Sequence, residues 1–207
     1  LLTYLGQLAR GDLGYSYVTD QPVADAIASR IPTTAVLALL AMVLWMALAI
    51  PVGVFTATRR GSWPDRAVLV GATLTLSLPA FWLARMAQYW LSYRLGVFPV
   101  AGYRGFAHLL LPALTLAVLA RYGLRNALVP VVTVLGMDIA YLLGGVVFVE
   151  NVFALPGIGT LAVQSVFNLD VAMILGVVLF SGTCVVSTNL LVDALYQWID
   201  PRVKSSN

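Results

Sequence analysis

Long apolar stretches separated by short polar segments dominate this chain. A helix rises about 1.5 Å per residue, so about 20 apolar residues cross the roughly 30 Å hydrocarbon core of a bilayer. Long uncharged runs favour helices, which satisfy their own backbone in lipid, and the apolar–polar alternation of a barrel strand is not seen. The pattern predicts an all-α polytopic membrane protein with five membrane helices, at residues 31–58, 67–92, 109–120, 124–149 and 171–197.

Composition supports a membrane protein. The chain is 60% hydrophobic and 10% charged, with a mean hydropathy of +0.91, whereas soluble domains contain about 25% charged residues. The net charge of +3 comes from short basic clusters between apolar stretches, and no basic stripe with interleaved aromatic residues is present. We therefore expect the lipid bilayer as the surrounding medium and no nucleic-acid partner.

The basic segments predict the orientation. Residues 58–66 contain three arginines, and the tail at 200–204 is also basic, so both should be cytoplasmic. Five crossings then place residues 150–170 outside, and also an external segment at residues 1–30. The first helix should begin at Ile31, with Pro32 in its first turn.

One of the five helices is too short. The apolar run at 109–120 has 12 residues, about 18 Å of helix, and only three residues separate it from the stretch at 124–149. We expect an incomplete helix at 109–120.

Rare residue types exclude several chemistries. Cys184 is the only cysteine and lies in an apolar run, and His108 is the only histidine, so a cysteine or histidine-rich metal site is not expected. Lys204 is the only lysine, so the chain contains no phosphate-binding loop ending Gly-Lys-Ser/Thr. If ATP drives this protein, another subunit binds it.

The stretch at 124–159 holds the main candidate site residues. Asp138 lies in the middle of an apolar run, where an acid costs about 2.5–3.5 kcal/mol and usually faces a bundle interior or a water-filled path. A structural contact with a neighbouring helix is an equal alternative. Pro156, Gly157 and Gly159 end the run and predict a turn.

These motifs resemble a known family. The chain is similar to the inner-membrane permease subunits of bacterial ATP-binding-cassette (ABC) importers for peptides, in the dipeptide/oligopeptide permease B branch, which also includes nickel importers. The matching segments follow the family's order over nearly the whole chain: Gly-Asp-Leu-Gly-Tyr-Ser-Tyr (11–17), Arg-Ile-Pro-Thr-Thr (30–34), Pro-Val-Gly-Val (51–54), Arg-Arg-Gly-Ser-Trp-Pro-Asp-Arg (59–66), Leu-Pro-Ala-Phe-Trp-Leu (78–83), Leu-Arg-Asn-Ala-Leu-Val-Pro (124–130), Val-Glu-Asn-Val-Phe-Ala-Leu-Pro-Gly-Ile-Gly (149–159), Asn-Leu-Leu-Val-Asp-Ala-Leu-Tyr (189–196) and Asp-Pro-Arg (200–202).

The resemblance implies a type I ABC importer permease fold, with the transmembrane permease domain at residues 31–207, in the bacterial inner membrane. It implies a second homologous permease subunit, two ATPase subunits that hold ATP and Mg²⁺, and an external solute-binding protein or lipoprotein. The chain itself would then be no enzyme and would carry no cofactor. Peptides are the expected cargo, with nickel or another small solute as the alternative.

The resemblance also suggests roles for individual residues. Asp138 and Tyr141 would line the translocation path, and Glu150, Asn151 and Phe153 would belong to the path or its external gate. For Glu150 and Asn151, a capping and turn role is the alternative. The residues expected on the ATPase side are Arg125, Asn126 and Pro130, with simple anchoring at the membrane surface as the other interpretation.

Two departures from the family concern missing segments. Family members have a further membrane helix before the position of Leu1, and a coupling loop of a few dozen residues between Leu116 and Leu124; both appear absent from this sequence. We hypothesise that the natural subunit contains the loop. A mass of 22.2 kDa for the intact subunit would refute that hypothesis.

Two other function classes stay open on the residues alone. An ion-coupled secondary transporter could use Asp138 as its cation site, but it should show inverted repeats, which this sequence does not display. A membrane scaffold without transport is the third possibility. Co-purification with ATPase subunits would separate these from an importer.

Overall fold

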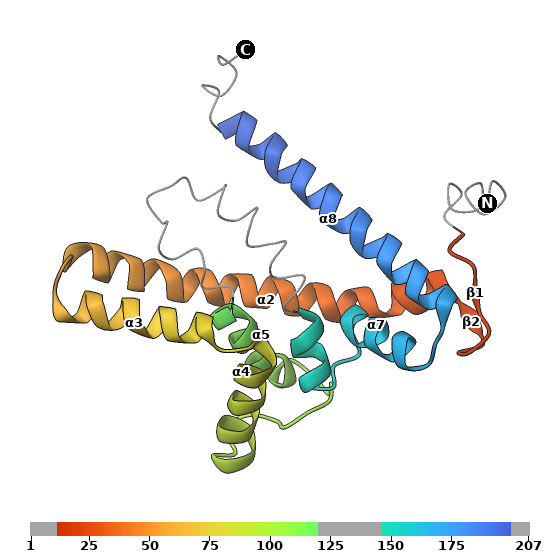
Figure 1. The fold of residues 1–207 in the computed structure, drawn as a ribbon, viewed down its shortest axis with the longest axis horizontal. Helices are drawn as coiled ribbons and strands as arrows, with labels where there is room; N and C mark the ends of the chain where they lie inside the picture. The colour runs from red at the N-terminus through yellow and green to blue at the C-terminus, as the bar shows by residue number, and fades with distance from the viewer. Residues whose placement is uncertain (1–11, 120–145, 200–207) are drawn as a thin grey trace.

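The computed structural model of the chain describes residues 12–119 and 146–199. Within them, one long helix runs the length of the molecule, with most of the other helices along one side of it, and a small hairpin precedes it (Figure 1). The elements are β1 (Tyr15–Ser16), β2 (Gln21–Pro22), α2 (Val23–Thr58), α3 (Trp63–Ser77), α4 (Ala80–Ala87), the π-helix η1 (Gln88–Arg94), α5 (Ala107–Leu119), a helical stretch at 146–152, α7 (Ile158–Phe167) and α8 (Val171–Ile199).

Helix α2 is the central element. It has 36 residues and starts at Val23, eight residues before the predicted Ile31, so Pro32 lies inside the helix and not in its first turn. The prediction was wrong here because the charged residues Asp25 and Arg30 end an apolar run but do not end a helix. Its buried residues recur at helical spacing and form one stripe facing the other elements: Val23, Ala26, Ile27, Thr33, Leu37, Ala41 and Trp45.

The predicted helix at 67–92 is broken in the structure. Helix α3 ends at Ser77, Leu78 is extended, and α4 begins after Pro79 with its axis turned by 106°. Proline disfavours helical geometry in the residue before it and lacks the N–H that would continue the ladder. The prediction of one straight helix overlooked this break.

The remaining helices follow the apolar pattern more closely. Helix α5 covers the part of the stretch expected at 109–120 that lies within the described residues, and α8 covers the stretch expected at 171–197. Among the described residues, α2 and Val171–Leu191 of α8 are long and apolar enough to span a membrane, and the bent α3–α4 pair could form a third span. The predicted helix at 124–149 lies mostly outside the described residues. The helices confirm a polytopic membrane protein.

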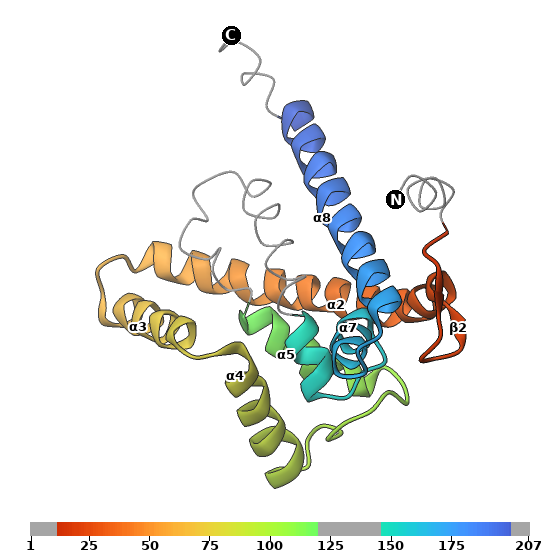
Figure 2. The same ribbon diagram turned by 45° about the vertical axis from the view of Figure 1, so that its right-hand side comes forward.

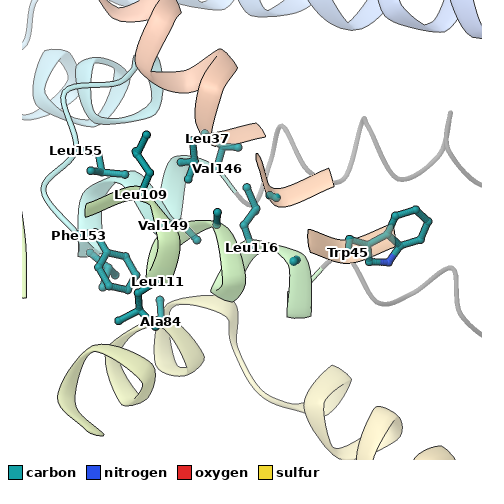
Figure 3. Close-up of a cluster of buried hydrophobic side chains, with 14 residues drawn as sticks. Leu37, Trp45, Ala84, Leu109, Leu111, Leu116, Val146, Val149, Phe153 and Leu155 are labelled. Carbon is teal, nitrogen blue, oxygen red and sulfur yellow. The ribbon is translucent and has the colours of Figure 1, made fainter. Parts of the chain in front are cut away.

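Two hydrophobic clusters hold these elements together. The larger joins α2, α4, α5 and residues 146–155, with the side chains of Leu37, Leu109, Val149 and Phe153 meeting as drawn in Figure 3. The smaller joins the start of α2 to α7 and the start of α8 through Val23, Ile27, Leu161, Met173 and Val177. From there α8 runs away from α2, as both ribbon views show (Figures 1 and 2).

The hairpin before α2 is fastened to α8. Strands β1 and β2 are antiparallel and pair Tyr15 with Pro22. The buried Ser16 hydroxyl donates to the Asp170 carboxylate, whose other oxygen accepts the N–H of Met173 at 3.1 Å and so caps α8. On the exposed side, the Tyr15 hydroxyl donates to Asp20 at 2.7 Å, and this bond raises the pKa of Tyr15. The Asp170 carboxylate therefore links the two separate external segments predicted at 1–30 and 150–170.

Candidate functional site

A tight turn at residues 150–157 follows the helical stretch at 146–152. The N–H of Leu155 donates to the carbonyl of Glu150 at 2.9 Å, which closes the turn. Ala154 has a φ of +51°, a conformation uncommon for a side chain other than glycine. Pro156 cannot continue a helix, and Gly157 precedes α7 in an extended conformation. The turn thus brings the start of α7 back against the end of the preceding helix.

The Glu150 carboxylate sits at the centre of this turn and is fully buried. One oxygen, Oε1, accepts the Thr34 hydroxyl at 2.6 Å, and Oε2 accepts the N–H groups of Gly159 at 2.7 Å and Thr160 at 3.2 Å. Thr34 is on α2, whereas Gly159 and Thr160 are in the first turn of α7. The carboxylate therefore joins three segments.

The Thr34 hydroxyl completes the network as both a hydrogen-bond donor and an acceptor. It donates to Glu150 and accepts the N–H of Ile158 at 2.9 Å. Burial raises the pKa of the Glu150 carboxyl, whereas its hydrogen bonds and the charge of Arg30, one helical turn before Thr34, act to lower it. We call Thr34, Glu150 and the first three N–H groups of α7 (Ile158, Gly159, Thr160) the α7 clasp.

The chemistry of the α7 clasp matches an ionised carboxylate. The first N–H groups of a helix have no partner within the helix, and the helix dipole favours negative charge there. The Thr34 hydroxyl and the N–H groups of Gly159 and Thr160 all donate to Glu150, and hydrogen bonds to an ionised group are about twice as strong as neutral ones. Glu150 thus caps α7 from a distant position in the sequence.

Two glycines allow this close approach. A Cβ at Gly157 would lie 2.0 Å from Oε1 of Glu150, and one at Gly159 would lie 2.5 Å from the Cα of Val147. Neither position has room for a methyl group. Glycine is therefore required at positions 157 and 159 by packing against Glu150 and the helix that carries it.

The other side of the turn is held by Gln88 from the π-helix η1. Its amide nitrogen donates to the carbonyls of Val100 at 2.7 Å and Val152 at 3.1 Å, and its amide oxygen accepts from Arg85 at 3.1 Å. The N–H of Gly102 donates to the carbonyl of Phe153 at 2.9 Å. Single π-helical turns often occur at functional sites. Here η1 and the following loop satisfy carbonyls that the turn leaves free.

Asn151 and Phe153 are also structural neighbours of the clasp. The Asn151 amide donates to the carbonyls of Val147 at 2.8 Å and Gly159 at 3.4 Å. Phe153 is 1% exposed and packs in the larger hydrophobic cluster beside Leu109 and Leu111 (Figure 3). The structure thus brings together the three residues predicted for the external gate. The contacts of Glu150 and Asn151 are those of the capping and turn alternative, whereas Phe153 is a buried packing residue.

The other predicted site residues are not placed. Asp138, Tyr141, Arg125, Asn126 and Pro130 lie outside the described residues. In the described part of the chain, no group of three or more His, Cys, Asp or Glu side chains could hold a metal ion.

Sequence reasoning did not select Thr34, Gln88 or Asp170. Gln88 carried a signal, since a polar residue inside an apolar stretch is expensive unless paired. Asp170 directly precedes the apolar run of α8, which is the pattern of a helix cap. Thr34 lies in the Arg-Ile-Pro-Thr-Thr segment (30–34) that carries the family resemblance, and this membership is the one signal that separates it from most other hydroxyl residues of α2.

Comparison with known proteins gives matches over most of the chain. Residues 49–123 and 118–205 match the family described as binding-protein-dependent transport system inner membrane component. The chain is 38% identical to a peptide transport system permease protein of Brucella abortus and 35% identical to the glutathione transport system permease protein of Escherichia coli. Each alignment covers 97% of this chain and 78% of the relative.

The alignments also bear on the missing coupling loop. They extend over 245 and 237 residues, which exceeds the 207 residues of the chain, so the relatives have internal residues that this chain lacks. The two family matches meet at residues 118–123. That is the junction where the length of the apolar run predicted a shortfall.

Proposed function

Because the chain belongs to the family of inner-membrane components of binding-protein-dependent transport systems, we propose that it is a permease subunit of an ATP-driven importer of short peptides. The observation that carries this proposal is the family match across residues 49–205, on helices with exposed apolar faces. The names of the two relatives support a peptide or peptide-like cargo such as the tripeptide glutathione.

In the proposed complex, this chain forms one half of a path through the inner membrane, and a homologous permease subunit forms the other half. Two ATPase subunits bind ATP and Mg²⁺ in the cytoplasm, and an external solute-binding protein delivers the cargo. No bond of the cargo is made or broken by this chain. ATP-driven closure of the ATPase pair would switch the helices between inward-open and outward-open states.

Within this chain, we assign Asp138 and Tyr141 to the path and Arg125, Asn126 and Pro130 to the ATPase side. A carboxylate in an apolar helix can meet the ammonium terminus of a peptide transiently. Asp138→Ala should therefore leave assembly intact but reduce uptake or its coupling to ATP hydrolysis. Unchanged uptake of several peptides by this variant would show that Asp138 has only a structural role.

The direct test is uptake into vesicles that contain the complex purified with its partner subunits. Labelled dipeptides and glutathione should accumulate only when ATP and the binding protein are present. Accumulation of Ni²⁺ without peptide uptake would favour the small-solute alternative. Uptake that survives ATP depletion but stops when the proton gradient is dissipated would instead support an ion-coupled transporter.

A further inference from the structure

The α7 clasp connects two parts of the chain that are 116 positions apart in sequence, Thr34 and Glu150. Resting on the proposed importer function, we propose that Glu150 is a positioning residue whose clasp stays closed throughout the transport cycle. The first part of α2, the turn at 150–157 and α7 then move as one rigid body. The external segment between the predicted helix at 124–149 and α8 is thus carried by α2 and does not open separately as a flap.

Burial of the carboxylate is the first argument for a closed clasp. Glu150 is 0% exposed and accepts three hydrogen bonds. Withdrawal of α7 from α2 would leave a buried charge and several N–H groups without partners, which is among the most expensive changes a protein interior can undergo. A gate that opens in each cycle would not be built across such a contact.

Close packing is the second argument. The Oε1 atom of Glu150 fills the space in front of Gly157, and the backbone of Gly159 lies directly against Val147. Packed interiors have discrete arrangements and do not deform continuously. A small sliding movement of α7 would therefore require the whole contact to break.

The third argument is that the turn is also held from its opposite side. Gln88 and Gly102 bind the carbonyls of Val152 and Phe153, and Phe153 and Leu155 are buried in the larger hydrophobic cluster. The turn thus has partners on α2, α7 and η1 simultaneously. Movement of the turn relative to any one of these helices would therefore break hydrogen bonds.

A reversible cross-link tests whether the clasp opens. Cys184 is the chain's only cysteine, so Cys184→Ser followed by Thr34→Cys and Ile158→Cys leaves one cysteine on each side of the clasp. The backbone N–H of Ile158 is 2.9 Å from the Thr34 hydroxyl, so the two residues are near enough for a disulfide or a short cleavable thiol cross-linker to join them. The complex, with its partner subunits, is reconstituted in vesicles, oxidised, and assayed for ATP-driven peptide uptake before and after reduction. The single-cysteine variants serve as controls for the substitutions.

If the clasp stays closed, oxidised and reduced vesicles should take up peptide at rates within about twofold of each other, because a link between residues that stay adjacent throughout the cycle blocks no required movement. A loss of about tenfold or more on oxidation, restored by reduction, would overturn the proposal, because it is the loss expected when a required movement is blocked. Absence of uptake by the unmodified complex would instead count against the importer function itself.

A second measurement avoids the buried contact and covers the case in which the cysteine pair fails to assemble. Spin labels at the exposed positions Ser29 on α2 and Gln164 on α7 report the distance between the two helices. This distance should be the same in the resting complex and in the ATP-bound complex trapped with vanadate. A change of more than about 5 Å, the scale of one helical turn, would show that α7 moves independently of α2.

The variant Thr34→Ser distinguishes positioning from simple packing. It keeps the hydroxyl that links Glu150 to Ile158, so ATP hydrolysis and peptide uptake should remain coupled. Thr34→Val removes the hydroxyl at almost equal volume, so Glu150 loses a hydrogen bond to its charged group. Uptake per ATP hydrolysed should then fall about tenfold, and the KM for peptide should stay unchanged. Equal behaviour of the two variants would contradict a positioning role.

Discussion

The turn around Glu150 and the part of α8 after Val177 differ in how their side chains are surrounded. Around Glu150, charged and polar groups are buried and paired, and glycines allow backbones to touch. In α8, residues after Val177 such as Val178, Val186 and Leu190 are more than half exposed, and a Cβ at Gly182 would meet nothing within 4 Å. The first region fixes geometry, whereas the second presents apolar side chains for lipid or another subunit to cover.

The comparison predicts a strong difference in sensitivity to substitution. A change near Glu150 should alter both stability and transport, because the buried carboxylate and the Thr34, Gly159 and Thr160 groups that donate to it would lose their partners. A change on the exposed face of α8 should be tolerated as long as the residue remains apolar. The following variants test this difference, beginning with the largest expected effect.

Glu150→Ala should be the most damaging single substitution. It leaves the buried N–H groups of Gly159 and Thr160 without an acceptor and opens a cavity, and each unsatisfied group costs about 1–3 kcal/mol. We expect the free energy of unfolding, measured by SDS titration of the purified complex, to fall by about 3 kcal/mol or more.

Two controls accompany this variant. Glu150→Gln keeps one acceptor and the volume, so it should lose less than half as much. Phe148→Ala, on the exposed face of the same helical stretch, should cost much less. Equal losses for Glu150→Ala and Phe148→Ala would mean that the clasp contributes nothing beyond ordinary packing.

Gly157→Ala and Gly182→Ala form a matched pair from the two regions. A methyl group at Gly157 would collide with the Glu150 carboxylate, and overpacking of this kind costs about 1–3 kcal/mol. At Gly182, in the middle of α8, the methyl group has free space, and alanine is a better helix former than glycine by about 1 kcal/mol.

The measurement for this pair is the melting temperature of the complex in lipid nanodiscs. Gly157→Ala should lower it, and Gly182→Ala should leave it unchanged or raise it slightly. A lower value for Gly182→Ala would show that another subunit packs closely against that position and that α8 is less open than in the isolated chain.

The same contrast explains what could be predicted from the sequence. Membrane-spanning helices are recognisable because their apolar runs must match the bilayer thickness, and α8 lies close to where the apolar pattern places it. The break at Pro79 was readable from its proline but was overlooked. These are local features, determined by neighbours in the sequence.

The α7 clasp could not be predicted in this way. Glu150 was selected as a candidate, but its partner Thr34 lies on a helix 116 positions earlier, and no periodicity relates the two. The motif 149–159 shows that a turn is required, whereas the packing of Gly157 against the carboxylate becomes visible only in three dimensions. Tertiary hydrogen bonds of this kind have no local sequence signal.

Gln88→Leu tests the opposite side of the turn. The leucine side chain has a similar volume but no amide, so the carbonyls of Val100 and Val152 lose their donor. We expect a loss of about 1–2 kcal/mol in the free energy of unfolding, because neutral hydrogen bonds are worth about 1 kcal/mol each. Tyr89→Phe, on the neighbouring exposed residue, is the control and should cost less than about 0.5 kcal/mol. Equal losses of unfolding free energy for the two variants would show that η1 does not stabilise the turn.

Ser16→Ala should have the smallest effect and a local one. The substitution removes the hydroxyl that ties the hairpin to Asp170, but Asp170 continues to cap α8 through the N–H of Met173. Hydrogen exchange in residues 15–22 should therefore become about tenfold faster, the factor that corresponds to loss of one hydrogen bond, while the melting temperature of the complex stays nearly constant. Tyr15→Phe removes only the exposed bond to Asp20 and should leave exchange unchanged. If both variants accelerate exchange equally, the bond to Asp170 does not hold the hairpin more firmly than the hairpin's own turn does. The tightly held external region that contrasts with the exposed face of α8 would then start at α2 and exclude the hairpin.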